Sequence, residues 1–400
     1  MASGKSSLFA RIIVVLAIVG CLYAAYYYFN RNKAGGGDSG APQSGAGSTG
    51  SAGSKGSAVE IGIAYGTEKK NWLEWAVQEF ANTPDGGKIK INLIPKGSLE
   101  GAQALVAGDK TIQVWSPASS LYKDTFVQDW QIKYSNAPIL KEESLALTPM
   151  VFVIWEERYQ ALIQKYKSLN FTTIAQALQE KGGWNAIAQK PEWGLFKLGH
   201  THPTKSNSGL MTLVLMAYDF DNKTRDLTLK DLLDVQFQNW MATMERGVSG
   251  LSDSTGTMMK DMVLKGPSSY DAVFVYESVA IDFLRSAEGR WGEVHIVYPR
   301  ENMWSDNPYY IIDAPWSSKE QRAAADTFLK FLLTENVQKE SLRHGFRPAD
   351  PNVPIKFAES PFTVYQRYGL QIEPGSTCDP PKAEIISNLL QIWQRSQGGR

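Results

Sequence analysis

Residues 199–218 read GHTHPTKSNSGLMTLVLMAY, and the fold prediction starts from this stretch. A polar loop rich in Ser, Thr and Asn leads directly into an apolar run, Leu210 to Tyr218, whose length suits a buried helix. Small hydroxyl and amide side chains are preferred at helix starts, where the first backbone N–H groups lack intrahelical partners. Such a start can also hold an anion. The residues alone leave open whether Ser206, Asn207 and Ser208 cap the helix or bind a ligand.

The same order of strand, polar loop and helix occurs earlier in the chain. Val59 to Ala64 has the composition of a strand, and apolar spacing predicts a helix from Trp72 to Ala81. A second unit pairs a strand, Ile89 to Ile94, with a helix, Leu99 to Ala107, and a third strand covers Thr111 to Trp115. Alternating strands and helices predict an α/β fold with mainly parallel sheets. Loops after parallel strands line one crevice, so these loops are candidate binding segments.

The later part of the chain continues this pattern. The run MVFVIW, residues 150–155, predicts a buried strand. A Met-rich helix, Met258 to Leu264, follows the hydroxyl residues Ser254, Thr255 and Thr257. These hydroxyls either cap that helix or face a ligand, and the residue types fit both roles.

Length and charge limit the classes of protein to consider. The chain has 400 residues, more than one hydrophobic core usually serves, so two core-forming units are expected. Lys plus Arg and Asp plus Glu number 41 each, so no net charge favours nucleic acid as a partner. Cys21 and Cys378 lie far apart in segments of different character, which argues against a disulfide framework and a thiolate metal site.

Residues for catalysis or metal binding are sparse. His200 and His202 could bind a metal from one face of a strand, but no third ligand has a suitable spacing, and a solvated or capping role is preferred. The chain has no nucleophile elbow, no Walker loop and no dinucleotide-binding glycine motif after a strand. We therefore expect no cofactor, no metal and a binding protein, not an enzyme.

The N-terminus predicts a membrane attachment. Lys5 and Arg11 precede an uncharged run at residues 12–29, long enough nearly to span a bilayer, and residues 34–57 are almost entirely Gly, Ser and Ala. The preferred interpretation is an anchor, residues 1–33, that keeps the body outside the cytoplasmic membrane. A lipoprotein signal with Cys21 as the acylated residue is the alternative, and a buried helix of a soluble domain is the third.

Several segments resemble one known family when taken together. They are VWSPASSLY, LALTPMVFVIW, GHTHPTKSNSGLMTLVLMAY, SYDAVFVYES and NPYYIIDAPWSS, in that order along the chain. This order is similar to that of bacterial extracellular solute-binding proteins with the type 2 periplasmic-binding fold. The likeness covers roughly residues 58–346 and is strongest to a subgroup often joined to a von Willebrand A domain, although no such domain follows here.

The resemblance implies two α/β lobes joined by crossover strands, with the ligand held between them. The implied division is 58–148 for the first part of lobe 1, 149–308 for lobe 2, and 309–400 for the return part of lobe 1 with C-terminal helices. The crossovers would lie near residues 147–153 and 309–313. The implied ligand-binding residues are Thr67 and Lys69 on the first loop, Ser98 on the second, Ser116 and Ser119 on the third, Ser206, Asn207, Ser208 and Thr255 on lobe 2, and Glu277 at a strand end.

Two functions are compatible with this resemblance. In the first, the protein captures a small, anionic or carboxylate-bearing ligand and delivers it to an ABC-type permease. In the second, the same fold is a ligand sensor or envelope scaffold that binds a protein partner, such as one carrying a von Willebrand A domain. The residues leave the ligand unidentified, because hydroxyl-lined clefts serve oxyanions, carboxylates and sugars alike.

Overall fold

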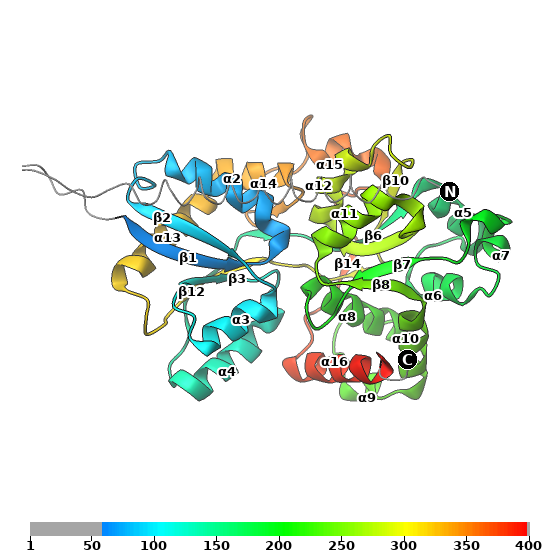
Figure 1. Ribbon diagram of the computed structural model, residues 1–400, viewed down its shortest axis with the longest axis horizontal. Coiled ribbons are helices and arrows are strands. Elements are labelled where there is room, and N and C mark those ends of the chain that lie inside the picture. Colours follow the sequence, from blue (N-terminus) through cyan, green and yellow to red (C-terminus); the bar gives the residue numbers. More distant parts are fainter. Residues whose placement is uncertain (1–57, 398–400) are drawn as a thin grey trace, which may run out of the picture. The chain divides into compact units, whose positions relative to one another are not determined.

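Strand β1 (Val59–Tyr65) shows how the sequence builds the first sheet. Ile61, Ile63 and Tyr65 pack on one face of the sheet, whereas Ala64 packs on the other. This alternation is the period of two that a strand imposes, and both faces are apolar because helices cover both. The computed structural model describes residues 58–397, which form two lobes (Figure 1).

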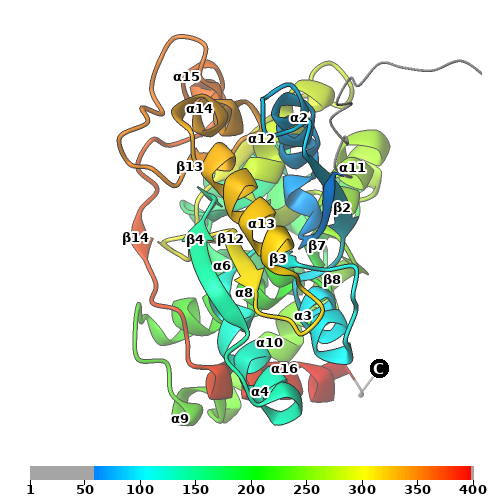
Figure 2. The same ribbon diagram turned by 90° about the vertical axis from the view of Figure 1, so that its left-hand side faces the viewer.

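Lobe 1 is a five-stranded sheet in the order β2-β1-β3-β12-β4 with helices on both faces. Helix α13 packs on β1 and β12, and α3 packs on the opposite face beside α4 (Figure 2). The elements of this lobe are β1, η1 (Thr67–Lys69), α2 (Lys70–Ala81), β2 (Ile89–Pro95), α3 (Ser98–Ala107), β3 (Val114–Ser116), η2 (Ser120–Tyr122), α4 (Lys123–Tyr134), β4 (Ile139–Ser144), β12 (Pro308–Ile312), α13 (Lys319–Leu332) and α14 (Glu335–Arg343).

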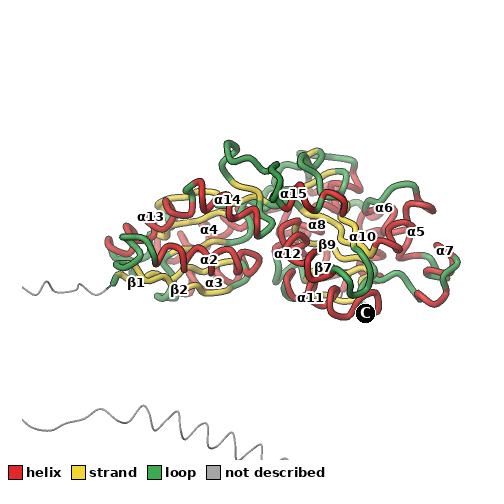
Figure 3. Tube along the Cα trace, turned by 90° about the horizontal axis from the view of Figure 1, so that it is seen from above, coloured by secondary structure: helices red, strands yellow, loops and turns green. Residues whose placement is uncertain are grey.

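Lobe 2 is a second five-stranded sheet, in the order β10-β6-β9-β7-β8, and helices again enclose the strands (Figure 3). Helix α8 is mostly apolar, and its residues 207–218 are all buried, as expected for a helix inside a lobe. The elements are β6 (Met150–Trp155), α5 (Glu156–Tyr166), α6 (Phe171–Gln179), α7 (Trp184–Ala188), η3 (Pro191–Trp193), β7 (Leu198–Thr201), α8 (Asn207–Asp221), α9 (Leu229–Leu232), α10 (Val235–Gly247), β8 (Val248–Ser252), α11 (Thr255–Lys265), η4 (Gly266–Ser268), β9 (Ala272–Tyr276), α12 (Glu277–Ala287), β10 (Val294–Val297) and β11 (Glu301–Asn302).

The chain passes between the lobes through a hinge built from paired extended segments. Strand β5 (Ala146–Leu147) pairs with β13 (Arg347–Pro348), and Thr148 bridges to Ser305. The crossings lie a few residues away from the predicted ones, because 150–155 already belongs to lobe 2 and 308–312 to lobe 1.

The hinge also explains the strand directions. β6 and β12 are the first strands of a sheet after a crossing, and each is antiparallel to both of its neighbours. These strands start at the hinge and run outward, whereas β1, β3, β7, β8 and β9 lie in parallel pairs. Their carboxyl ends therefore face the space between the lobes, where ligands bind in open α/β sheets.

The C-terminal part differs from the predicted division. The return segment belongs to lobe 1 as far as α14, but β13 then leads toward lobe 2. Strand β14 (Ser376–Thr377) pairs with β11, and helix α16 (Ala383–Gln397) packs on α8, α9 and α10. The short α15 (Pro361–Val364) and η5 (Gln366–Tyr368) lie between β13 and β14. The apolar face of α16, which holds Leu389 and Trp393, is buried there and fixes its location.

Most predicted elements are confirmed within a few residues. The helix predicted at 210–218 extends over 207–221, and the helix predicted at 258–264 extends over 255–265, because the polar residues before each belong to its first turn. The predicted anchor at residues 1–33, which includes the apolar run at 12–29 and Cys21, lies outside the described residues, as does the predicted Gly-, Ser- and Ala-rich linker at 34–57. Within residues 58–397, no helix combines the length and the apolarity that crossing a bilayer requires.

Candidate ligand-binding cleft

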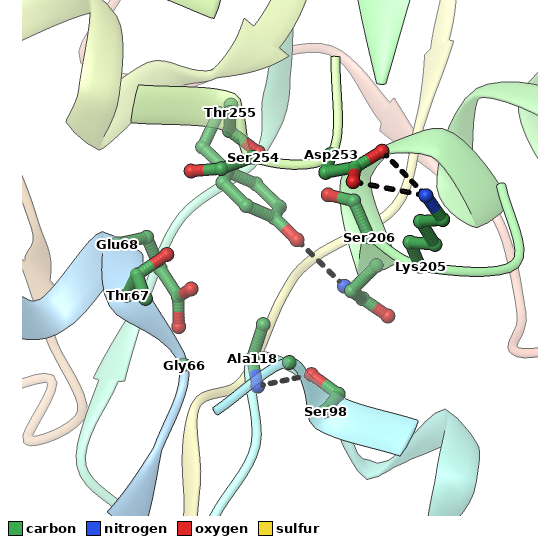
Figure 4. Close-up of a pocket in the computed structure, with 13 residues that line it drawn as sticks. Gly66, Thr67, Glu68, Ser98, Ala118, Lys205, Ser206, Asp253, Ser254 and Thr255 are labelled. Carbon is green, nitrogen blue, oxygen red and sulfur yellow. Dashed lines mark hydrogen bonds and ion pairs between the residues drawn. The ribbon is translucent and has the colours of Figure 1, made fainter. Parts of the chain in front are cut away.

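A small cavity lies between the two lobes at the carboxyl ends of their parallel strands (Figure 4). Its volume is about 30 Å³, and two grooves of about 410 Å³ and 360 Å³ adjoin it and share Thr67 and Ser254 with it. One water needs about 10 to 15 Å³ of such volume, so the cavity by itself has room for an ion of a few heavy atoms. Its lining residues are Gly66, Thr67, Glu68, Gly97, Ser98, Ala118, Lys205, Ser206, Asn207, Asp253, Ser254, Thr255 and Tyr276.

Lobe 1 supplies the loops that follow β1, β2 and β3. Thr67 and Glu68 lie on η1, directly after β1, and Ser98 is the first residue of α3. The Ser98 hydroxyl accepts a hydrogen bond of 3.0 Å from the backbone N–H of Ala118, which ties the second loop to the third. The backbone N–H of Gly66 donates to the Ser116 carbonyl at 3.0 Å. The loops of this wall are therefore bonded to one another.

Lobe 2 supplies the starts of helices α8 and α11. The hydroxyl of Ser208 is the centre of a buried network, with oxygen atoms 2.6 Å from Thr201 Oγ1, 2.6 Å from Thr255 Oγ1 and 3.1 Å from Ser206 Oγ. Ser206 and Thr255 reach the cavity, whereas Ser208 is fully buried behind them. A satisfied buried network of this kind fixes its members in place, so both helix starts are held at one separation.

Backbone donors point to the kind of ligand this cavity suits. Among the described residues, nothing accepts a hydrogen bond from the first backbone N–H of α3, α8 or α11, at Ser98, Asn207 and Thr255. All three residues line the cavity and are at least nine-tenths buried. Unpaired N–H groups at helix starts carry partial positive charge and attract anions. The arrangement can hold an oxyanion or a carboxylate without a formal counter-charge.

The charged side chains around the cavity are paired. Lys205 donates to both oxygens of Asp253 at 3.0 and 2.9 Å, and this pair lies at the exposed mouth. Glu68 accepts a hydrogen bond of 2.7 Å from the buried Lys69. Burial lowers the pKa of the Lys69 ammonium, although the neighbouring Glu68 carboxylate opposes that change. The lining therefore has little net charge, and its polarity comes mainly from backbone and hydroxyl groups.

Two predicted ligand-binding residues are placed in structural roles instead. Lys69 donates to Glu68, to the Pro117 carbonyl at 3.0 Å and to Asn307 Oδ1 at 3.0 Å, so its three N–H donors hold loops and a crossover together. Glu277 is fully buried and forms a two-pronged ion pair with Arg347, with both N–O distances at 2.7 Å. Neither side chain lines the cavity.

The structure brings together about half of the predicted site. Thr67, Ser98, Ser206, Asn207 and Thr255 line the cavity, and their role in ligand binding stays a prediction. The remaining predicted residues, Lys69, Ser116, Ser119, Ser208 and Glu277, lie behind this lining layer. The Ser119 hydroxyl caps η2 by accepting from the Leu121 N–H at 3.3 Å, and the Ser116 hydroxyl is fully buried beneath the first loop. Ser116 is buried because side chains alternate between the two faces along β3, and the Ser119 hydroxyl is used in capping η2.

Sequence reasoning missed Glu68 and Tyr276. Glu68 follows a predicted site residue in the same loop, so the strand-end pattern that pointed to Thr67 could have included it. Tyr276 precedes Glu277 at the end of β9, and its hydroxyl accepts a hydrogen bond of 2.8 Å from Asn207 Nδ2. Burial raises the pKa of the Tyr276 hydroxyl, so this group stays protonated and can donate to a ligand.

The lobes contact each other on both sides of the cavity. Asn71 Nδ2 on α2 donates to Asp282 Oδ2 on α12 at 2.9 Å, which joins lobe 1 to lobe 2. On the other side, a Cβ added to Gly97 would lie 3.0 Å from the Lys205 carbonyl oxygen, so a larger residue would hold the lobes apart. This structure is consequently a closed arrangement of the lobes around the cavity.

The two neighbouring histidines are engaged away from the cavity. His200 Nδ1 donates to the Thr201 carbonyl at 2.8 Å, and its Nε2 lies 3.0 Å from Glu245 Oε1. His202 accepts from Thr204 and packs edge-on against Trp393. No cluster of three His, Cys, Asp or Glu side chains within residues 58–397 is arranged to hold a metal ion.

Two α/β lobes, a hinge and a polar cleft at the carboxyl ends of the strands are the features of a solute-binding protein of the two-lobed type. The profile of one family, described as bacterial extracellular solute-binding protein, matches residues 61–347. The chain belongs to this family, so the predicted family is confirmed, whereas the predicted subgroup associated with von Willebrand A domains stays a prediction.

Individual relatives are distant. The thiosulfate-binding protein of Pseudomonas aeruginosa is 24% identical over 197 residues, which is 48% of this chain and 55% of that protein, so the match spans about half the length of this relative. The fold is similar to that of the sulfate-binding protein SubI from Mycobacterium tuberculosis, with a TM-score of 0.54, 14% identity, and coverage of 86% of this chain and 99% of that chain.

Proteins of this fold bind chemically different ligands. A ferric binding protein from Campylobacter jejuni has a TM-score of 0.56 at 13% identity, covering 84% of this chain and 99% of that one. A maltose-bound protein from T. maritima has a TM-score of 0.54 at 13% identity, covering 84% of this chain and all of that one. The shared fold therefore leaves the ligand to be inferred from the lining of the cavity.

Proposed function

We propose that the cleft captures a small oxyanion or carboxylate and that the protein delivers this ligand to an ABC-type permease. The observation that carries the proposal is the convergence of three helix starts, at Ser98, Asn207 and Thr255, on one buried cavity. Their unpaired N–H groups need acceptors, and an anion supplies several at once. The sulfate- and thiosulfate-binding names among the relatives fit the same ligand class.

Delivery requires that the lobes open so that the ligand is released. Asn71 and Asp282 form one contact between the lobes at the exposed edge of the cleft. Closure around the ligand adds selectivity, because a buried polar group left unpaired by a wrong ligand costs about 1 to 3 kcal/mol. We further propose that residues 12–29 anchor the body outside the cytoplasmic membrane, as the apolar run and its flanking basic residues predict.

A thermal-shift screen of the full chain in mild detergent tests the proposal. The panel contains oxyanions, carboxylates, sugars and divalent metals. A ligand at 100 times its Kd should add about 2.7 kcal/mol to the free energy of unfolding and raise Tm. We expect anions to raise Tm and sugars to leave it unchanged. A panel in which no anion raises Tm contradicts uptake of an anion and favours the sensor or scaffold function.

A matched pair of variants locates the binding site. Thr255→Val keeps the shape of the side chain but removes a hydroxyl that lines the cavity and accepts from or donates to Ser208. Losing one hydrogen bond between the Thr255 hydroxyl and the ligand should weaken anion binding about tenfold. Thr243→Val removes a hydroxyl on the exposed face of α10 and should leave binding unchanged. Equal affinities of the two variants would place the ligand elsewhere.

A further inference from the structure

The carboxylate of Glu68 is an unusual feature of a cavity suited to anions. Its side chain is only 8% exposed and lines the cavity, and Figure 4 shows its oxygens directed into the space between the lobes. Oε1 accepts a hydrogen bond from Lys69 at 2.7 Å. Within residues 58–397 no protein group donates to Oε2, so this oxygen can accept a hydrogen bond from a ligand.

The neighbouring lysines do not pair with Glu68 Oε2. All three N–H donors of Lys69 are used, by Glu68 Oε1, the Pro117 carbonyl and Asn307 Oδ1. Lys205 is bonded to both oxygens of Asp253 at the exposed mouth. Among the described residues no cation is left to pair with Glu68 Oε2, so this oxygen is free to accept a hydrogen bond from a ligand in the cavity.

A fully deprotonated oxyanion such as sulfate cannot donate that hydrogen bond. It has only acceptor oxygens, and a carboxylate also has only acceptors, so the two would face each other without a proton between them. Closing the lobes on such an anion removes solvent from Oε2 without giving it a donor, and bringing an anion to a carboxylate adds repulsion. An oxyanion that carries a proton can instead donate to Glu68 while its other oxygens accept from the helix starts.

We propose that the ligand is a protonated oxyanion of the hydrogen phosphate or hydrogen arsenate type, and that Glu68 selects it by accepting its O–H. This inference rests on the proposed anion-binding function and specifies the ligand further. Glu68 and the three helix starts line the same cavity, so one ligand can accept from the N–H groups and donate to the carboxylate. Glu68 thus becomes a residue that determines specificity, and the N–H groups of α3, α8 and α11 remain the general anion-binding groups.

Pairs of oxyanions with the same shape test this inference by titration calorimetry on the full chain at neutral pH. Phosphate and arsenate carry a proton there, whereas sulfate and selenate do not. We expect phosphate to bind at least about a hundredfold more tightly than sulfate, and arsenate to bind more tightly than selenate by a similar factor. The reason is that a site with an unpaired acceptor rejects an analogue that lacks the O–H group to pair with it. Sulfate binding as tightly as phosphate would overturn the inference and leave the proposed function intact.

The variant Glu68→Gln sharpens the test. Its amide oxygen can still accept from Lys69, while its amide nitrogen places a donor where Oε2 was. The preference for phosphate over sulfate should fall at least about tenfold or reverse. Glu74→Gln, on the exposed face of α2, removes the same charge outside the cavity and should keep the wild-type preference.

Other outcomes are also decisive. If Glu68→Gln fails to fold, the preference of the wild-type protein between matched oxyanions decides the inference by itself. If none of the four oxyanions binds, the inference is overturned. The carboxylates of the thermal-shift panel then show whether the proposed anion-binding function survives.

Discussion

The buried ion pair between Glu277 and Arg347 should be critical for stability and unimportant for ligand selectivity. Glu277 is fully buried at the start of α12, and Arg347 is 5% exposed in the hinge strand β13. Tyr298 donates a short hydrogen bond to Glu277, and Arg347 also donates to the carbonyls of Gln371 and Ile372. The pair therefore joins lobe 2 to the hinge and to the C-terminal segment.

Removing one partner should cost more than removing both. Breaking a buried ion pair from one side leaves an unpaired charge and costs about 3 to 5 kcal/mol, so Glu277→Leu and Arg347→Met would together cost about 6 to 10 kcal/mol if they acted independently. The double variant leaves no buried charge. It loses only the partners of two carbonyls and one hydroxyl, at about 1 kcal/mol each, so we expect a cost of about 3 kcal/mol.

Urea denaturation of the wild-type protein, both single variants and the double variant measures these costs in one cycle. The coupling between the two residues should be several kcal/mol, which only a direct interaction produces. Additive costs, or single variants that each lose less than about 1 kcal/mol, would refute the role assigned to the pair. A Glu277→Leu protein that keeps its stability but no longer binds the ligand would return Glu277 to the binding site.

Three further predictions follow from the contacts described above. Asn71→Ala removes the hydrogen bond to Asp282 across the cleft and should speed ligand dissociation about three- to tenfold in stopped-flow measurements. An unchanged dissociation rate would show that this hydrogen bond does not help to keep the lobes closed. Ser208→Ala removes the central hydroxyl of the network and should lower the free energy of unfolding, measured by urea denaturation, by about 1 to 3 kcal/mol. A loss below about 0.5 kcal/mol would contradict a stabilising role for the network. Burial lowers the pKa of His200, but Glu245 more than offsets this effect and the pKa is raised from 6.5. The stabilising contribution of protonated His200 is therefore complete below pH 6.5 and is lost as the pH rises through the folded-state pKa. We expect the Tm of the wild-type protein to fall as the pH rises from 6.5 through that pKa, and the Tm of His200→Gln to fall less. Parallel curves of Tm against pH for the two proteins would disprove the coupling between His200 and Glu245.

Much of the fold could be predicted because local patterns carry it. The strand at 150–155 is apolar at every position, as a strand buried on both faces must be, and its bounds match the prediction. The long apolar run after Asn207 similarly indicated a helix buried within a lobe. The location of α16 was harder to predict, because an amphipathic helix indicates that one face is covered without indicating what covers it.

The site was predictable at the level of loops and less so at the level of side chains. Ser98, Asn207 and Thr255 begin helices, and a residue at a helix start after a strand must lie at the cleft edge of the sheet. Lys69 lies on the expected loop, but its ammonium turns inward toward Asn307, a residue 238 positions later in the chain. No local pattern reports such a contact.

The sequence by itself determined the element types, the approximate strand ends and the supply of small polar residues at helix starts. These properties depend on interactions within a few residues, such as capping and the periods of helices and strands. Only the tertiary structure decided that Glu68 keeps an unpaired oxygen in the cavity while Glu277 is neutralised by Arg347. The physical reason is that a carboxylate acquires its role from burial and from partners that the fold brings from distant parts of the chain.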